Sequence, residues 1–179
     1  MSIIRRFGCC LVFLTLHGGV VFARKDSAIT SQHPVTQVHS IQVAKELRAE
    51  FGDLLQRSPT FRAQYQRIAA AGDQAVIVGV HVDVRLCETS FRARTTFRRY
   101  RTGLMVADVA IGPGGQPGEW IAHEFEHILE QLDGRNLPQL ANSHANDVWF
   151  SGSDVIETDR AIRAGRTVRD ELRQPPNSR

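Results

Sequence analysis

The fold of this chain turns on the stretch WIAHEFEHILEQLDG, residues 120–134. Large apolar side chains recur in it at the spacing of one helical face: Ile121, Phe125, Ile128 and Leu132. Gly134 stands just beyond the last of them, where helices commonly end. The turn-forming segment GPGGQPG, residues 112–118, precedes the stretch. This pattern predicts an amphipathic helix over residues 119–133 that buries one face.

Two histidines lie on another side of the same helix. His123 and His127 are four residues apart, about one helical turn, so both imidazoles can bind one metal ion at Zn–N distances of about 2.0–2.1 Å. Glu124 is rotated by about 100° from His123, where its carboxylate can take a proton from a zinc-activated water that attacks a carbonyl group. The pattern H-E-x-x-H on a helix therefore indicates a catalytic zinc centre. The alternative is a solvated helix face with two histidines.

The motif resembles that of the zincin metallopeptidases. The resemblance rests on HEFEH, residues 123–127, and on a weaker downstream match at Glu157. It implies a peptide or protein substrate and hydrolysis of peptide bonds, with Glu124 as general base. It also implies a small domain in which the motif helix faces a short mixed sheet. An edge strand before that helix would hold the substrate in extended form, and the resemblance places this edge at residues 104–111.

A catalytic zinc ion takes three protein ligands and a water, so a third ligand must come from elsewhere in the chain. The metzincin pattern continues to Gly and a third His, but Glu130 and Asp133 stand at those positions. Without the glycine the chain does not turn sharply enough to bring Asp133 back. The gluzincin pattern takes a Glu from a second helix. Glu157 fits this pattern, on the apolar side of a helix expected over residues 154–172.

Glu157 also has a purely structural interpretation. Asp154 and Glu157 have the spacing of a capping box, in which Glu157 would serve the start of the helix. Many gluzincins carry an acidic residue four positions after the ligand Glu to hold a zinc histidine, but Ala161 stands there in this chain. The carboxylate that orients the histidine is therefore expected from another residue, either Asp154 or Asp159.

Weaker candidates lie outside the motif. His144, in a loop between the two helices, and Tyr100 can each stabilise the oxyanion of a tetrahedral intermediate, or simply serve a surface or structural role. Trp149 and Phe150 are interpreted as a hydrophobic staple before the last helix. Cys87 is interpreted as a small buried apolar residue.

Apolar periodicity in the rest of the chain predicts a single α+β domain over residues 41–173. Two helices are expected first, then three strands: 41–56, 59–72, 75–86, 93–100 and 104–111. The motif helix and a C-terminal helix that carries Glu157 complete the domain. Helices, strands and again helices in this order favour an α+β layout over a repeating βαβ winding.

The segment FRARTTFRRYR, residues 91–101, holds five arginines interleaved with aromatic residues. We interpret it as a solvated strand face or a sheet edge whose charges prevent pairing between molecules. The alternative is a site for acidic partners or anionic envelope polymers.

The N-terminus has the parts of a secretory signal peptide. Arg5 and Arg6 precede an apolar run over residues 7–22, and Val21 and Ala23 suit signal peptidase. Cleavage is expected after Ala23, with a secreted or periplasmic product and no stable membrane insertion. A retained membrane anchor is the alternative, although the run is short for a span. The next residues, 24–40, are expected to form a flexible lead, and residues 174–179 a disordered tail.

Composition narrows the functional class further. With 179 residues, 42% apolar and 23% charged, the chain is expected to form one folded domain rather than a disordered protein. Its net charge of +3 falls to +1 once Arg5 and Arg6 leave with the signal, so nucleic acid is not an expected partner. Cys87 is then the only cysteine, which excludes an internal disulfide.

These features predict an exported zinc metallopeptidase. Its zinc ligands would be His123, His127 and Glu157, and Glu124 would be its general base. A non-catalytic zinc-binding module that presents a surface to an envelope or extracellular partner is the second hypothesis, and a metal-free binding domain is the third. Replacement of Glu124 by Gln separates the first two hypotheses. In an enzyme it would abolish turnover while zinc stays bound, whereas in a non-catalytic module it would change little.

Overall fold

The computed structural model describes residues 40–88, 92–152 and 155–175, which belong to one compact unit over residues 36–179. The expected signal peptide lies outside the described residues, as do the lead up to residue 39 and the tail from residue 176. The principal elements follow in the order β1 (Ile41–Val43), α1 (Arg48–Arg57), α2 (Pro59–Ala71), β2 (Val76–Val82), β3 (Ala93–Arg99), β4 (Met105–Ile111), α3 (Pro117–Leu132), α4 (Leu137–Asn142), β5 (Val148–Phe150), β6 (Ile156–Thr158) and α5 (Asp159–Arg173). Helices and a short mixed sheet confirm the α+β prediction.

The main sheet has the strand order β1-β2-β4-β3. β1, β2 and β4 run parallel, whereas β3 pairs antiparallel with β4 from Ala93 opposite Ile111 to Arg99 opposite Met105. The expectation that residues 104–111 form the edge is therefore wrong: β4 is an inner strand, and β3 is the edge. Strand order depends on how distant segments pair, so the apolar pattern of β4 could not show that β3 covers its outer side.

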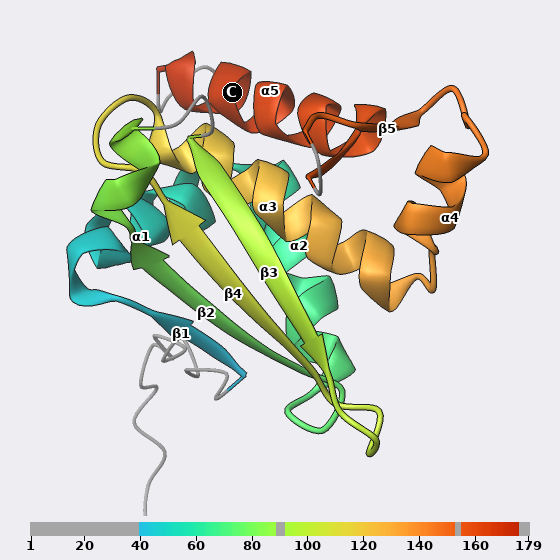
Figure 1. The fold of residues 1–179 in the computed structure, drawn as a ribbon. Helices are drawn as coiled ribbons and strands as arrows, with labels where there is room; N and C mark the ends of the chain where they lie inside the picture. The colour runs from blue at the N-terminus through green and yellow to red at the C-terminus, as the bar shows by residue number, and fades with distance from the viewer. Residues whose placement is uncertain (1–39, 89–91, 153–154, 176–179) are drawn as a thin grey trace, which may run out of the picture. The chain divides into compact units, whose positions relative to one another are not determined.

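Helices α1, α2 and α3 lie on one face of the main sheet, and α5 packs on α3 (Figure 1). The core between them joins Val78 of β2 and Val109 of β4 to the apolar face of α3, where Phe125 is fully buried. Phe51 of α1 and Phe61 of α2 lie against the Phe125 ring, with centroid distances of 5.8 and 5.1 Å. This core fixes α3 beneath the sheet, so the opposite side of α3 is presented to the space beside β3.

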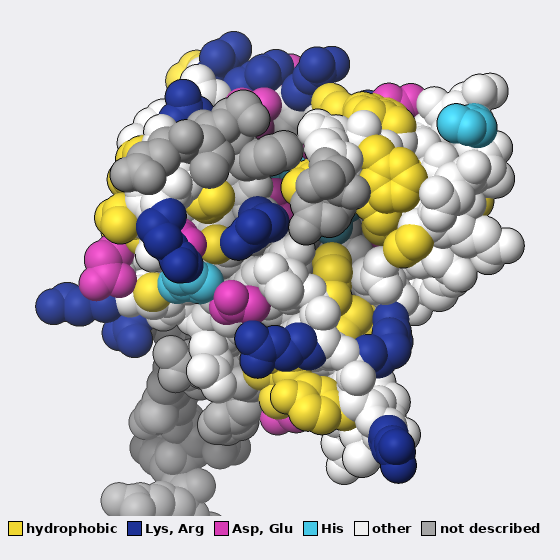
Figure 2. Space-filling model, viewed as in Figure 1, with side chains coloured by type: hydrophobic (Ala, Val, Ile, Leu, Met, Phe, Trp, Pro, Cys, Tyr) yellow, Lys and Arg dark blue, Asp and Glu magenta, His cyan; other side chains and the backbone are white. Residues whose placement is uncertain are grey.

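The opposite face of the sheet is solvated. Along β3, the side chains of Ala93, Thr95 and Phe97 are half-buried, whereas Arg94 and Arg98, on the other face of the strand, are exposed. Figure 2 shows Lys and Arg side chains spread over the face on which β3 lies. The arginine-rich segment is thus an exposed edge strand, as one of the two interpretations of its sequence predicted.

Local signals account for several helix ends. Ser58 caps α2, its hydroxyl accepting a hydrogen bond from the Phe61 amide at 2.9 Å, and Pro59 occupies the first helical position. Residues 41–56, by contrast, are not one helix, because the chain begins with β1 and becomes α-helical only at Arg48. β1 hydrogen-bonds to β2, so pairing with a distant strand overrides the helical spacing there.

The second strand also differs from its expected range. β2 ends at Val82, and a 3-10 segment, Val84–Glu88, follows it. The Asp83 carboxylate accepts hydrogen bonds from the backbone and guanidinium of Arg85, which turns the chain and leaves Val84 69% exposed. The Arg85 hydrogen bonds lower the pKa of Asp83 to about 2. Among the described helices, none is both long and apolar enough to cross a membrane.

Candidate metal centre

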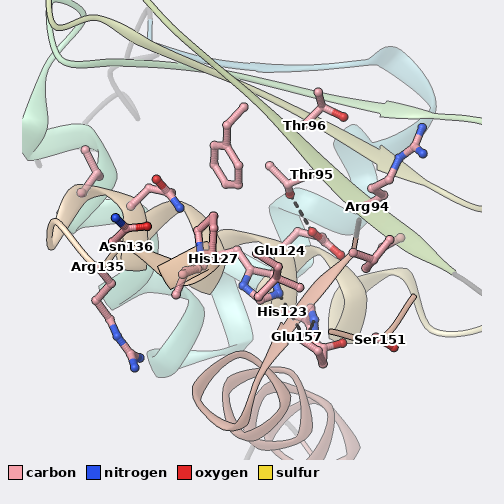
Figure 3. A pocket seen from close by; sticks show the side chains of 18 of the residues that line it. Arg94, Thr95, Thr96, His123, Glu124, His127, Arg135, Asn136, Ser151 and Glu157 are labelled. Carbon is pink, nitrogen blue, oxygen red and sulfur yellow. Dashed lines mark hydrogen bonds and ion pairs between the residues drawn. The ribbon is translucent and has the colours of Figure 1, made fainter. Parts of the chain in front are cut away.

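An open cavity of about 1230 Å³ lies between β3, the polar side of α3 and the β5–β6 hairpin. Its walls carry Thr95 from β3, His123, Glu124 and His127 from α3, and Glu157 from β6 (Figure 3). The apolar face of α3 is held in the core, so the histidines of the motif are directed into this cavity. Segments far apart in the sequence thus supply its polar groups.

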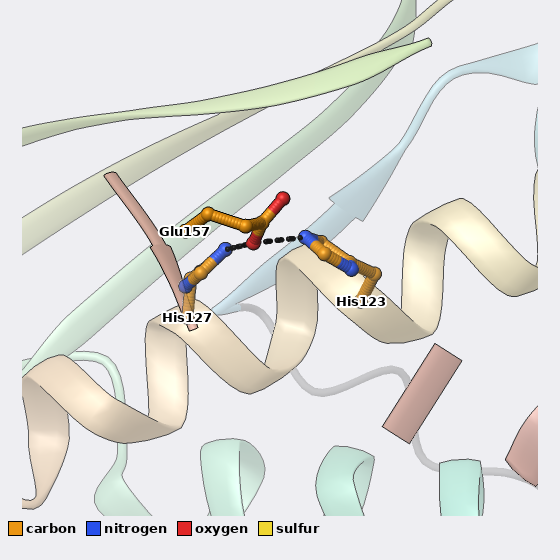
Figure 4. Close-up of side chains that lie close together, drawn as sticks. All are labelled: His123, His127 and Glu157. Atoms are coloured by element: carbon orange, nitrogen blue, oxygen red, sulfur yellow. Dashed lines mark ion pairs between the residues drawn. The ribbon is translucent and has the colours of Figure 1, made fainter. Parts of the chain in front are cut away.

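Two histidines and one carboxylate meet at the floor of the cavity (Figure 4). Oε1 of Glu157 lies 3.0 Å from Nε2 of His123 and 3.3 Å from Nε2 of His127. The three ligand atoms all lie within 4.8 Å of one another. Ligand atoms on a tetrahedral ion with bonds of about 2.0–2.1 Å are about 3.3 Å apart, so this cluster can hold a metal ion with little rearrangement.

Glu157 reaches this cluster from a strand, not from a helix. It lies in β6, which pairs antiparallel with β5 so that Glu157 is opposite Trp149. α5 begins only at Asp159, so the prediction that a helix over residues 154–172 carries Glu157 is wrong. The N-cap of α5 is Thr158, whose hydroxyl accepts a hydrogen bond from the Ala161 amide at 3.0 Å. The apolar spacing predicts α5, but the helix begins five residues later than expected, because a three-residue strand such as β6 has too little periodicity to be detected.

The capping-box interpretation of Glu157 therefore fails. Its carboxylate faces the histidines, and Thr158 serves the helix start instead. Asp154 lies outside the described residues. A small residue lets α5 approach α3 at Gly165, where a Cβ would lie 2.9 Å from the carbonyl oxygen of Glu119 and 3.2 Å from Cβ of His123.

A fully buried carboxylate, Glu130, orients His127. Oε2 of Glu130 lies 3.0 Å from Nδ1 of His127 and accepts the Thr158 hydroxyl at 3.1 Å. Oε1 accepts a hydrogen bond from Arg135 at 2.8 Å. Asp159 does not have this role, because it pairs with Arg163, and Asp154 lies outside the described residues. Glu130 stands three residues after His127 on the same helix. This spacing could have indicated the contact from the sequence, because residues three apart on a helix are neighbours.

The metal-free cluster has strongly shifted pKa values. Burial lowers the pKa of His127, but hydrogen bonds to Glu130 and Glu157 outweigh it and raise this pKa to about 10. Burial raises the pKa of Glu157, but hydrogen bonds to His123 and His127 lower it to about 2. Without a metal, His127 is therefore protonated and forms an ion pair with the ionised carboxylate of Glu157.

Glu124 lies beside the cluster without belonging to it. Its side chain is almost buried, and Oε2 accepts a hydrogen bond of 2.6 Å from the Thr95 hydroxyl of β3 (Figure 3). This bond joins the motif helix to the edge strand and fixes the direction of the carboxylate. Sequence reasoning gave Glu124 its place but missed Thr95, because that contact depends on β3 being the edge.

Other candidates lie away from this cavity. Tyr100 is 52% exposed, and neither it nor His144 is among the residues that line the cavity. The Asp133 carboxylate is bound by Arg67 and Arg160, at 2.6 and 2.8 Å, so it does not serve as a ligand here.

Two sequence interpretations are wrong. Cys87 is exposed rather than buried. Trp149 and Phe150 form part of β5 and are 37% and 42% exposed, and Glu157, not either of them, directly precedes the Thr158 cap, where a staple residue would stand. Both errors concern residues whose surroundings are set by turns and short strands that periodicity does not reveal.

The chain was compared with family models, with curated proteins and with solved structures. None of the three comparisons finds a match. What can be concluded about this protein therefore comes from its own residues and from their geometry.

Proposed function

We propose that this protein is an exported zinc metallopeptidase that hydrolyses peptide bonds. The observation that carries the proposal is the convergence of His123, His127 and Glu157 beside a separately held carboxylate, Glu124. The N-terminal apolar run supports export to the periplasm or the extracellular space.

The donor set supports zinc as the metal. Two imidazole nitrogens and one carboxylate oxygen match the three protein ligands of catalytic zinc sites, which keep a further position for water or substrate. The contact between Glu130 and Nδ1 of His127 leaves Nε2 of that ring for the metal. A bound zinc ion would supply the Lewis acidity that makes water a nucleophile at neutral pH and polarises the carbonyl group.

Glu124 would move the proton. Its carboxylate would accept a proton from the attacking water as the new C–O bond forms, and would return it to the amide nitrogen as the C–N bond breaks. The Thr95 hydroxyl would hold one carboxylate oxygen of Glu124 and leave the other for this transfer.

β3 would hold the peptide. The amide of Gly112 donates to the Arg92 carbonyl and that of Tyr100 to the Leu104 carbonyl. In an antiparallel ladder this alternation directs the backbone groups of Ala93, Thr95 and Phe97 away from β4, toward an edge that no described strand covers. An extended peptide can pair with those groups beside the cluster.

The test is metal content together with turnover. Elemental mass spectrometry of the purified protein should find about one zinc per chain, which Glu157→Ala should lose and Glu124→Gln should keep. Peptide-library hydrolysis should be abolished in Glu124→Gln, with a fall in kcat of at least about 100-fold. Retained zinc in Glu157→Ala would exclude that ligand. Zinc without any hydrolysis would support a non-catalytic zinc-binding module.

A further inference from the structure

The arginines of β3 and its flanks differ from the other arginines of the described structure. Elsewhere most are held in ion pairs with carboxylates, as Arg67 and Arg160 are with Asp133. Within the described ranges no ion pair involves the five arginines of this segment: Arg92, Arg94, Arg98, Arg99 and Arg101. Among the described residues, these cations have no carboxylate partner.

Three of these arginines, Arg92, Arg94 and Arg99, line the cavity. The two carboxylates that also line it are engaged: Glu157 faces the histidines and Glu124 accepts the Thr95 hydroxyl. Arg99 donates only to neutral groups, among them Oε1 of Gln131 at 3.2 Å. No carboxylate of the described structure forms an ion pair with these three arginines, so the rim of the cavity carries positive charge, and a bound divalent cation would add to it.

The geometry of paired strands determines which side chains of a bound peptide would face these arginines. Side chains that face each other across paired strands lie on the same face of the sheet. A peptide paired antiparallel with β3 would place every second side chain opposite Arg92 and Arg94, on the solvated face. The alternate peptide residues, between those that face the arginines, would exchange backbone hydrogen bonds with Ala93 and Thr95 and direct their side chains toward α3.

We infer that the cavity selects acidic peptides, with Asp or Glu at the alternate positions that face Arg92 and Arg94. The inference rests on the proposed function, because it takes a peptide as the occupant of this site. Opposite charges at facing positions of a sheet favour pairing by about 1.4- to 5-fold for each pair. Two such pairs should give about a five-fold preference for the acidic peptide at low ionic strength, and salt should weaken it.

The test is a binding measurement that does not need turnover. Fluorescence anisotropy would compare labelled (Glu-Ala)2 with (Gln-Ala)2, which are too short to face Arg98 as well as both Arg92 and Arg94, on the zinc-loaded Glu124→Gln protein. The acidic peptide should bind about five-fold more tightly. The double variant Arg92→Gln/Arg94→Gln should bind both peptides equally, with (Gln-Ala)2 binding unchanged as the control for folding.

Arg98→Gln is the matched control. Arg98 is exposed on the same strand and face but does not line the cavity, so its replacement should leave the preference intact. Equal affinity of the original protein for both peptides would overturn the inference. So would a preference that survives the double variant or disappears in Arg98→Gln.

N-methylation separates strand pairing from plain attraction of anions. Methyl groups on the alanine nitrogens of (Glu-Ala)2 remove the hydrogen bonds to β3 and keep the charge, so affinity should fall. Methyl groups on the glutamate nitrogens point away from β3 and should cost little. Equal binding of both methylated peptides would overturn the inference in favour of non-specific polyanion binding. Failure of the proposed function would be seen separately, as absence of zinc and of hydrolysis in the original protein.

Discussion

Glu130 connects the histidine pair to β6, the strand that carries the third candidate ligand, Glu157. One of its oxygens lies against both His127 and Thr158, and the other accepts Arg135, so no part of this buried carboxylate is left without a partner. A group that fixes the ring of a metal-binding histidine also raises its affinity for the metal. Glu130 is therefore a positioning residue, acting through its neighbours.

We expect Glu130→Gln to weaken zinc binding by about 10- to 100-fold, because the amide cannot hold Nδ1 of His127 as a carboxylate does. Competition with a chelator of known affinity measures this. Glu126→Gln is the control: Glu126 is almost buried on the same helix but is bound by Gln64 and Arg160. Both variants should lose stability. A zinc affinity that falls equally in both would contradict a specific role for Glu130.

Zinc binding should release a proton from His127 at pH 8. The pKa of this residue in the metal-free protein is raised to about 10, above the ordinary value of 6.5, so His127 is charged at pH 8 and must become neutral to bind zinc. Its ion pairs stabilise the metal-free fold fully below about pH 6.5, and this contribution is lost as the pH rises through 10.

Calorimetric titration with zinc in buffers of different ionisation enthalpy measures the proton directly. About one proton per zinc is expected from His127 at pH 8, and none from this residue above pH 11. Glu130→Gln is the control, since it keeps the His127 ligand but removes a hydrogen bond that raises the pKa of His127, so it should release fewer protons. An enthalpy at pH 8 that is independent of the buffer would show that the ring was already neutral.

At the scale of elements, the approach of α5 to α3 depends on Gly165. Gly165→Ala should lower the free energy of unfolding by about 1–3 kcal/mol, because the added Cβ meets the carbonyl of Glu119 and the side chain of His123. Zinc affinity should fall with it, since His123 would be displaced. Denaturant unfolding and chelator competition measure the two effects.

Gly52→Ala offers the matched control for this substitution. Gly52 is exposed in α1, and a Cβ there would meet nothing within 4 Å. The change should therefore stabilise the protein, by about 0.4–1 kcal/mol, through the unfolded chain. If Gly165→Ala behaved in the same way, the close packing of α5 on α3 would not be required.

The short strands are the elements that apolar periodicity in the sequence could not predict. A helix of sixteen residues such as α3 repeats its apolar spacing over several turns, so its range and its polar side could be predicted. β1 and β6 have three residues each, too few for a period, and their pairing partners are distant in sequence or set by a hairpin. Glu157 was thus identified as a ligand candidate while its element was not.

At the scale of the whole molecule, the candidate site combines segments whose proximity only the fold creates. The spacing of His123 and His127 predicted their convergence, because one helix contains both. The Thr95 contact with Glu124 could not be predicted, since it depends on β3 lying outside β4. Local periodicity therefore indicated the chemistry of the site, whereas strand order determined its walls.

The order in which the ligands are synthesised has a consequence for export. A ribosome that has completed the α3 histidines has still to make Glu157, and β6 must then pair with β5 before the carboxylate faces them. If the protein is exported as proposed, a partly translocated chain carries two of the three groups and no complete centre. If it also cleaves peptides, it would not cleave its own secretion machinery, because the active site assembles only after the C-terminal segment has emerged and folded.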